Sequence, residues 1–260
     1  MRRPQIALAA RCLQLPVQKV FRPAHEYGAD GLQFDGVREL QPAELSGSGR
    51  RQLLLTLAER NLVISSLLVE PDRPLWDERD LDRRIDTLKQ TMQFAWDLQS
   101  RIVVTRMGRL PEEDGPREVL EAVLNDLAAH GNRCGVMLAL TPARDPVDDV
   151  LALMRKITAG PMGLSFDPAS IALSGQDVEA AWRALYSQVV HIQARDAIRD
   201  IDGQGIEVPV GRGEVGWDEL LPLIREAEYH GWFTVDRTTG DDRPGDAARA
   251  IQFLRTVLEE

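Results

Sequence analysis

Cysteine, long apolar runs and glycine-rich turns are scarce in this 260-residue sequence, and each scarcity excludes a class of protein. The two cysteines, Cys12 and Cys134, are too few and too isolated for a disulfide framework or a zinc site. No apolar run approaches the roughly 18 residues of a membrane span, and the N-terminal stretch is too soon interrupted for a signal peptide. We therefore expect a reduced, cytoplasmic location and no membrane partner.

Basic residues are also in the minority. The chain has 31 Lys and Arg against 41 Asp and Glu, which gives a net charge of −10 and an isoelectric point near 5.0. The long-range field of such a chain repels nucleic acid and anionic lipid, so neither is expected as a partner. A hydrophobic content of 43% and a charged content of 28% are ordinary for a folded protein and argue against disorder.

Short β-rich apolar runs alternate with longer amphipathic segments along the whole chain. Helical periodicity is clearest in 81–99, 118–135 and 218–231. Roughly eight strand–helix units in about 250 residues are typical of a (β/α)₈ TIM barrel, and no linker divides the chain, so we predict one domain over 1–260. The alternative, a doubly wound open sheet, usually has a glycine-rich first turn that this sequence lacks. The predicted strands are 6–12, 31–36, 62–69, 101–108, 136–142, 162–170, 189–196 and 232–238.

Polar residues gather at the ends of these strands, where the site of a TIM barrel lies. Side chains alternate along a strand, so Asp35, Asp167 and Asp236 face the barrel axis while their apolar neighbours face the helices. Further polar residues at strand ends are Arg11, Thr105, Arg106, Thr141, Gln193, Arg195 and Arg237. Parity is ambiguous for Arg106. Any single charge at such a position can simply be solvated or ion-paired, but their convergence predicts a binding pocket.

The segment VVHIQARD (189–196) places an unusual polar row on a buried strand. His191, Gln193 and Arg195 share one face, and Val190 and Ile192 share the other. His191 is either a catalyst or a packed imidazole bonded to Ser165 or Asp167.

The sequence resembles the sugar phosphate isomerase/epimerases of the xylose isomerase-like TIM-barrel superfamily. The resemblance covers nearly the whole chain, and the loop with a G-x-G turn before a helix-opening tryptophan is its most specific part. The segments that carry it are GADGLQFD (28–35), RIDTLKQTMQFAWDLQSRIVVTRMG (84–108), SFDPAS (165–170), VVHIQARD (189–196), VPVGRGEVGWDELL (208–221) and HGWFTVDR (230–237).

The resemblance implies a divalent metal held by Glu, Asp, His and Glu on strands five to eight, with the two glutamates commonly also serving as acid and base. Such a metal chelates two substrate oxygens and stabilises an enediolate. This sequence keeps Asp167 but has Thr141, Gln193 and the shorter Asp236 at the other positions, and Ser170 where a further histidine often stands. His191 and Asp196 match the first histidine and the aspartate of the H-x-H-x-x-D pattern of strand seven.

From this partial match we expect Asp167, Asp236 and Gln193 to hold Mg²⁺, Mn²⁺ or Zn²⁺ only weakly, and a site without any metal fits the sequence equally well. The candidate catalytic residues are Asp167, Asp236 and His191. The candidate substrate-binding residues are Arg11, Asp35, Arg106, Thr141, Gln193, Arg195 and Arg237. The arginines suit a carboxylate or phosphate and the aspartates suit sugar hydroxyls. Arg195 could instead be ion-paired with Asp196 or Asp236.

Three functions remain open on the sequence. The first is an isomerase or epimerase acting on a small sugar, polyol or sugar acid, the second a non-catalytic descendant that binds such a ligand or a partner, and the third a lyase or dehydratase of the same superfamily. The nuclease branch of the superfamily is not favoured, because these strand ends do not supply the larger set of histidine and carboxylate ligands that its sites use. A homodimer is the usual expectation for such barrels. GRGEVG (211–216) lacks the glycine order and the lysine of a phosphate loop. The polar loop 236–246 is expected to border the pocket.

Overall fold

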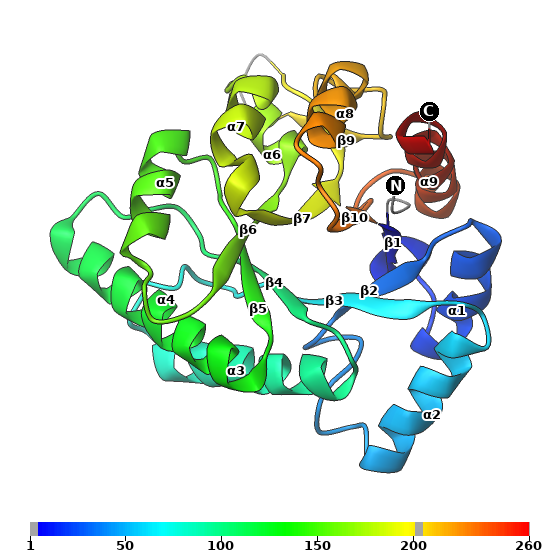
Figure 1. Ribbon diagram of the computed structural model, residues 1–260, viewed down its shortest axis with the longest axis horizontal. Helices are drawn as coiled ribbons and strands as arrows, with labels where there is room; N and C mark the ends of the chain where they lie inside the picture. The colour runs from blue at the N-terminus through cyan, green and yellow to red at the C-terminus, as the bar shows by residue number, and fades with distance from the viewer. Residues whose placement is uncertain (1–4, 201–204, 260) are drawn as a thin grey trace.

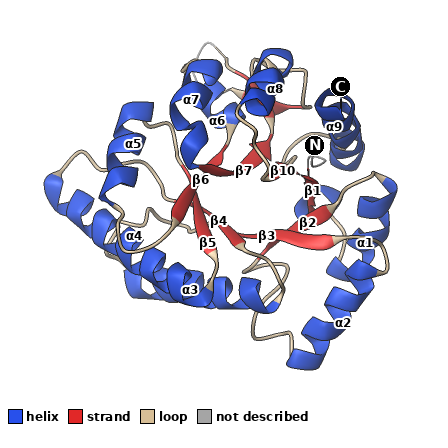
Figure 2. Cartoon of the chain, viewed as in Figure 1, coloured by secondary structure: helices blue, strands red, loops and turns tan. Residues whose placement is uncertain are grey.

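The computed structural model describes residues 5–200 and 205–259 and has the predicted TIM-barrel architecture (Figure 1). Eight parallel strands close into a barrel in the order β1-β10-β7-β6-β5-β4-β3-β2. Helices surround these central strands, and α9 lies beside β1, so that the last helix packs against the first strand (Figure 2). Residues 1–4, 201–204 and 260 of the predicted domain, 1–260, lie outside the described residues.

The eight barrel strands are short and every one of them is followed by helical structure. The strands of the barrel are β1 (Gln5–Ala9), β2 (Gly31–Asp35), β3 (Val63–Val69), β4 (Ile102–Arg106), β5 (Met137–Thr141), β6 (Met162–Phe166), β7 (Val189–Ala194) and β10 (Trp232–Val235). The α-helices are α1 (Val17–Glu26), α2 (Gly47–Ala58), α3 (Leu81–Asp97), α4 (Asp114–Cys134), α5 (Val147–Lys156), α6 (Pro168–Leu173), α7 (Val178–Leu185), α8 (Trp217–Glu226) and α9 (Arg243–Glu259). Two 3₁₀ turns, η1 (Ala10–Leu13) and η2 (Tyr186–Gln188), follow β1 and precede β7.

The predicted alternation of side chains is confirmed. Phe166 of β6 faces the helices, where its ring meets Trp182 of α7 edge to face with centroids 5.3 Å apart. Phe233 of β10 likewise meets Tyr229 outside the barrel at 5.5 Å. These contacts bury the outer face of the sheet against the helices, which is the main hydrophobic core. The side chains between them in sequence point inward.

Several strands end earlier than the sequence predicted, and the reason is local. After β1 the chain turns into η1, so Arg11 lies on a 3₁₀ turn instead of a strand. After β6, Pro168 opens α6 because its fixed φ suits the first turn of a helix, and Asp167 caps that helix by accepting a hydrogen bond from the Ser170 N–H at 3.2 Å. The site residues therefore lie just beyond the strands, on the turns that leave the barrel.

An antiparallel hairpin interrupts the pattern after β7. Its strands are β8 (Asp196–Ile198) and β9 (Ile206–Val208), with Ala197 opposite Glu207. The hairpin is separate from the barrel sheet and follows the strand that carries the polar row. It therefore adds side chains to the mouth that no barrel strand supplies.

The barrel interior has two unlike halves. Leu68, Val104 and Ala139 form a small apolar cluster on β3, β4 and β5. The remaining inward side chains at this depth form a neutral interior layer, which consists of Gln33, Ser66, Ser165, His191 and Thr234, all at most 1% exposed.

Within residues 5–200 and 205–259, no helix is long and apolar enough to cross a membrane.

Candidate functional site

Above the neutral interior layer, the mouth of the barrel carries a ring of charged side chains that we call the charged rim. It consists of Arg11, Glu70, Asp167, Arg195, Glu207 and Asp236. These residues come from turns or strand ends around the barrel and from the β8–β9 hairpin. Each of their side chains is at most 21% exposed, so their charges interact in a largely water-free space.

Arg195 is the most highly connected cation of the rim. Its Nη1 donates to Asp167 Oδ2 at 2.9 Å, its Nη2 lies 3.5 Å from Glu207 Oε2, and its Nε lies 4.0 Å from Asp236 Oδ2. The charge of Asp167 is the largest influence on the pKa of Arg195 and raises it, against the opposing effect of burial. Of the two ion-pair partners that the sequence offered for Arg195, Asp236 is confirmed, whereas Asp196 turns to the loop that follows the hairpin.

Arg11 and Asp236 form the second centre of the rim. Arg11 Nε and Nη2 donate to the two oxygens of Asp236 at 2.9 and 2.5 Å, a bidentate pair, and Arg11 Nη1 donates to Glu70 at 2.8 Å. Burial by itself would raise the pKa of Asp236, but the hydrogen bonds and charge of Arg11 lower it overall. Asp236 is therefore ionised and fixed in place. Arg106 at the end of β4 is half-exposed and pairs with Glu70 at 3.2 Å.

The other predicted binding residues lie near the rim with different roles. Gln193 donates from Nε2 to Asp236 Oδ2 at 3.3 Å, and Thr141 is buried beside Arg106 in the strand register. One carboxylate oxygen of Asp35 is occupied by its own turn, because Oδ1 accepts hydrogen bonds from the N–H groups of Val37 and Arg38 at 2.8 and 2.9 Å.

Arg237 joins the loop after β10 to the last helix. Its Nε donates to Asp246 Oδ2 at 3.0 Å and its Nη1 lies 3.7 Å from Glu207. Its guanidinium therefore links the start of the last helix to Glu207 of the charged rim. The structure thus brings Arg11, Asp167, Gln193, Arg195 and Asp236 together, places Arg237 beside this group, and leaves Asp35 engaged with its own turn.

His191 lies below the rim, in the neutral interior layer. Its Nδ1 is 2.9 Å from Ser165 Oγ and its Nε2 is 2.8 Å from Thr234 Oγ1. Burial lowers its pKa to about 3, so the ring is neutral at ordinary pH. This arrangement matches the packed imidazole bonded to Ser165. A catalytic role for His191 stays a prediction that its hydrogen bonds do not favour.

Three carboxylates near the mouth were missed by the sequence reasoning. Glu70 follows β3 directly, and counting in twos from Ser66 and Leu68 would have placed it inward. Glu207 lies on β9 and accepts a hydrogen bond from the Thr238 N–H at 2.9 Å; nothing local in the sequence marks it.

Glu39, the third of these carboxylates, accepts the Asp35 N–H at 2.8 Å, and burial followed by the charges of Asp35 and Asp236 raises its pKa. A carboxyl group with a raised pKa keeps its proton to a higher pH than Asp236 does, since the pKa of Asp236 is lowered.

The G-x-G loop is closed by an internal carboxylate. Asp196 accepts hydrogen bonds from the N–H groups of Gly211 and Gly213 at 2.9 and 3.0 Å and from Val215 at 3.3 Å. A Cβ at Gly213 would lie 2.1 Å from Asp196 Oδ1, which requires glycine there. The amides that would cradle a phosphate are thus used to shape the loop, and Trp217 packs at the start of α8 as expected.

Several cavities lie near these residues, and two of them adjoin β5 and β6. One of about 310 Å³ opens at the mouth and is lined in part by Arg106, Thr141 and Ser170. Because Ser170 bonds Asp167 and Arg106 pairs with Glu70, this cavity adjoins the charged rim.

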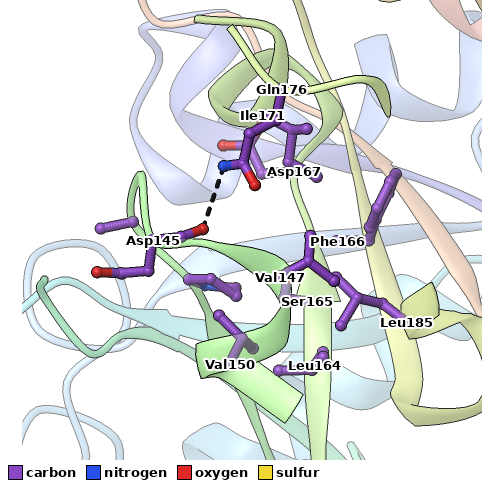
Figure 3. Close-up of a pocket in the computed structure, with 12 residues that line it drawn as sticks. Asp145, Val147, Val150, Leu164, Ser165, Phe166, Asp167, Ile171, Gln176 and Leu185 are labelled. Atoms are coloured by element: carbon purple, nitrogen blue, oxygen red, sulfur yellow. Dashed lines mark hydrogen bonds between the residues drawn. The ribbon is translucent and has the colours of Figure 1, made fainter. Parts of the chain in front are cut away.

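The second cavity, of about 20 Å³, lies behind β6 and is bordered mostly by apolar side chains, with Asp145, Ser165, Asp167 and Gln176 as its polar lining (Figure 3). Gln176 donates to the Asp145 carbonyl at 3.1 Å. It has room for about one water molecule. We therefore place the candidate site at the larger, mouth cavity.

With this fold and rim in view, comparisons with known proteins define the class. The sequence profile of the xylose isomerase-like TIM barrel family matches residues 21–257, so the chain belongs to that family. The rhizopine catabolism protein MocC of Rhizobium meliloti is 27% identical over an alignment of 196 residues that covers 62% of this chain and 60% of MocC.

Solved structures agree on the fold. A xylose isomerase domain protein from Planctomyces limnophilus has a TM-score of 0.84 at 19% identity and covers 98% of this chain and 96% of its own. A xylose isomerase-like TIM barrel protein from Mycobacterium smegmatis, solved with magnesium, has a TM-score of 0.80 at 19% identity over 99% and 98%. Epimerases and a probable dehydratase are also among the structural neighbours.

The donor atoms at the predicted metal position do not suit a divalent cation. Both oxygens of Asp236 accept from Arg11, and the oxygens of Asp167 accept from Arg195, Ser170 Oγ and Ser170 N–H. Gln193 turns its amide nitrogen toward Asp236. Within the described parts of the chain, no group of three or more His, Cys, Asp or Glu is arranged to hold a metal. The chemistry of this donor set is that of a guanidinium–carboxylate network.

Proposed function

We propose that the mouth of this barrel binds a small sugar, polyol or sugar acid, and that the protein is an isomerase- or epimerase-like member of its family. The observation that carries this proposal is a pair of buried polar atoms that have no hydrogen-bond partner in the described structure, Gln193 Oε1 and Arg195 Nε. One is an acceptor and the other a donor, and both side chains lie beside Asp236 Oδ2. A hydroxyl group is both donor and acceptor, so a hydroxylated ligand satisfies both atoms at once.

The adjoining cavity supports the same ligand class. Its volume of about 310 Å³ suits a small molecule, and Thr141, Ser170 and Arg106 give it hydroxyl and cationic groups. Arg106 is half-exposed and shares Glu70 with Arg11, so part of its guanidinium can receive a carboxylate or phosphate. The family's epimerases and dehydratase fit a ligand rich in hydroxyl groups.

Two carboxyl groups near the mouth, Asp236 and Glu39, are candidates for transferring a proton to or from the ligand. Asp236 is held ionised by Arg11 and is a weak base, whereas the pKa of Glu39 is raised, which makes Glu39 the better proton acceptor of the two. We therefore assign the proton-transfer role to Glu39 and the orienting role to Asp167, Gln193 and Asp236. If no proton is transferred, the same geometry describes a non-catalytic sugar-binding protein, the second candidate, which the arginine-paired carboxylates favour.

A thermal-shift screen tests the proposal. The full chain is heated with a panel of aldoses, ketoses, polyols and aldonic acids, and a ligand at ten times its Kd is expected to add about 1.4 kcal/mol, or about 3–5 °C in Tm. Gln193→Leu should remove most of the shift, while Gln176→Leu, at the cavity behind β6, should retain it. If no member of the panel moves Tm, the proposal fails.

The two candidates separate in D₂O. A hit from the panel is incubated with the protein and followed by ¹H NMR. Loss of a C–H signal next to a carbonyl, slowed at least about tenfold by Glu39→Gln, indicates isomerase-type chemistry. Binding without exchange identifies the non-catalytic alternative.

A further inference from the structure

The charged rim contains a group of buried carboxylates that could not coexist without a cation. The side chains of Asp167, Glu207 and Asp236 are 2%, 7% and 0% exposed. Negative charges in a space of this kind repel strongly and lose their hydration, so each needs a positive partner. The rim therefore has the electrostatic demand of a cation site.

One side chain, Arg195, contacts all three of these carboxylates. The three nitrogens of the Arg195 guanidinium each approach a different carboxylate, Asp167 at 2.9 Å, Glu207 at 3.5 Å and Asp236 at 4.0 Å. Arg11 and Arg237 each contact one of them, Asp236 and Glu207. The carboxylates come from the turns after β6 and β10 and from β9, so Arg195 joins segments that are far apart in sequence. A planar guanidinium cannot be deprotonated in a protein and suits this forked contact better than an ammonium does.

Arg11 is a second cation at Asp236. Its bidentate pair occupies both oxygens of that carboxylate. The side chain of Arg195 is only 13% exposed, and a divalent ion entering the cluster would meet its fixed positive charge at close range. Such an ion would have to displace Arg195 before it could reach Asp167.

We infer that Arg195 is the resident cation of this barrel, and that its guanidinium closes the Asp167–Glu207–Asp236 cluster to divalent metal ions. The missing histidine at Gln193 is then not the reason why the site does not suit a metal. The reason is the guanidinium of Arg195, which lies two residues later, just beyond the end of β7.

Manganese titration by calorimetry on the full chain tests this inference, with Mn²⁺ alone as the probe. Wild-type protein and Gln193→His are both expected to show no saturable binding at millimolar Mn²⁺, because Arg195 still holds the carboxylates. Arg195→Met should bind about one Mn²⁺ per chain at least about tenfold more tightly than the wild type. The double variant Gln193→His/Arg195→Met should bind more tightly still.

Arg249→Met is the matched control. Arg249 also contacts two carboxylates, Asp242 at 3.2 Å and Asp246 at 2.6 Å, but its side chain is 64% exposed. This variant should bind no more Mn²⁺ than wild type does. Circular dichroism and the unfolding midpoint establish that each variant is folded.

The inference is overturned if wild type or Gln193→His binds Mn²⁺ with near-unit stoichiometry, a result that does not depend on the arginine variant folding. It is also overturned if folded Arg195→Met binds no Mn²⁺. No sugar enters the titration, so a failed sugar screen and a failed metal titration are separate results.

Discussion

The neutral interior layer and the charged rim are built on the same strands, two residues apart. Ser165 precedes Asp167 and Thr234 precedes Asp236, and in each pair the first residue lies in the layer and the second in the rim. One step of about 6.6 Å along a strand thus separates uncharged hydrogen-bonded groups from ion pairs. Each level keeps a buried polar atom without a hydrogen-bond partner in the described structure, Gln33 Oε1 in the layer and Arg195 Nε in the rim, and Gln193 Oε1 lies beside the rim in the same state. The two levels therefore differ in charge and in their nearness to the mouth cavity, more than in how completely their hydrogen bonds are satisfied.

The largest expected difference between the charged rim and the neutral interior layer is in their contribution to the free energy of unfolding. Asp236→Ala leaves Arg11 and Arg195 as buried charges without this partner, and we expect a loss of about 3–5 kcal/mol in the free energy of unfolding. Thr234→Val, two residues earlier, removes one hydrogen bond to His191 and should cost about 1–2 kcal/mol. Urea unfolding measures both. Equal losses would show that the charges of the rim are no more important to the fold than the layer.

The neutral interior layer and the charged rim should affect stability in different pH ranges. The pKa of His191 is about 3 in the folded protein and 6.5 when exposed, so between these values the unfolded chain binds a proton that the folded chain does not. Stability therefore falls as the pH drops below 6.5, by about 1.4 kcal/mol per unit. Asp236 has a lowered pKa, so its stabilising contribution is present above 3.8 and is lost only in more acidic solution.

Denaturant unfolding between about pH 6.5 and pH 4.5 isolates the His191 contribution. His191→Gln should flatten the slope relative to wild type. His130→Gln changes a partly exposed histidine outside the site and serves as the control, with a smaller change in slope. If the free energy of unfolding changes with pH equally steeply in wild type and in His191→Gln, His191 is not a buried neutral imidazole.

The smallest expected effect is a difference in thiol reactivity. Cys12 is fully buried beside Asp236, its sulfur accepts the Arg237 N–H at 3.0 Å, and burial raises its pKa. Cys134 is partly exposed. Ellman's reagent should label Cys134 quickly and Cys12 only when the structure opens, as a comparison of Cys12→Ala and Cys134→Ala would show. Rapid labelling of Cys12 in the native protein would mean that the rim opens readily.

Much of the site was predictable because strand parity is a local property. Asp167, Asp236, Gln193 and Arg195 could all be placed at the mouth by counting along single strands, and the same count reaches Glu70. The pairing of Arg195 with Asp236 was among the alternatives that the sequence offered, but its contacts with Asp167, 28 residues away, and with Glu207 could not be predicted. Glu207 has no local signature, since a three-residue strand in a hairpin looks like loop sequence.

The sequence by itself determined the TIM barrel, the inward faces of its strands and the polar composition of its mouth. Hydrophobic periodicity and strand–helix alternation are set by neighbouring residues, so they can be counted along the chain. Only the tertiary structure decided that Arg11 meets Asp236 across 225 residues and that one guanidinium joins three carboxylates. Electrostatic partners are chosen by distance in space and by shared burial, and the closing of the barrel sets both.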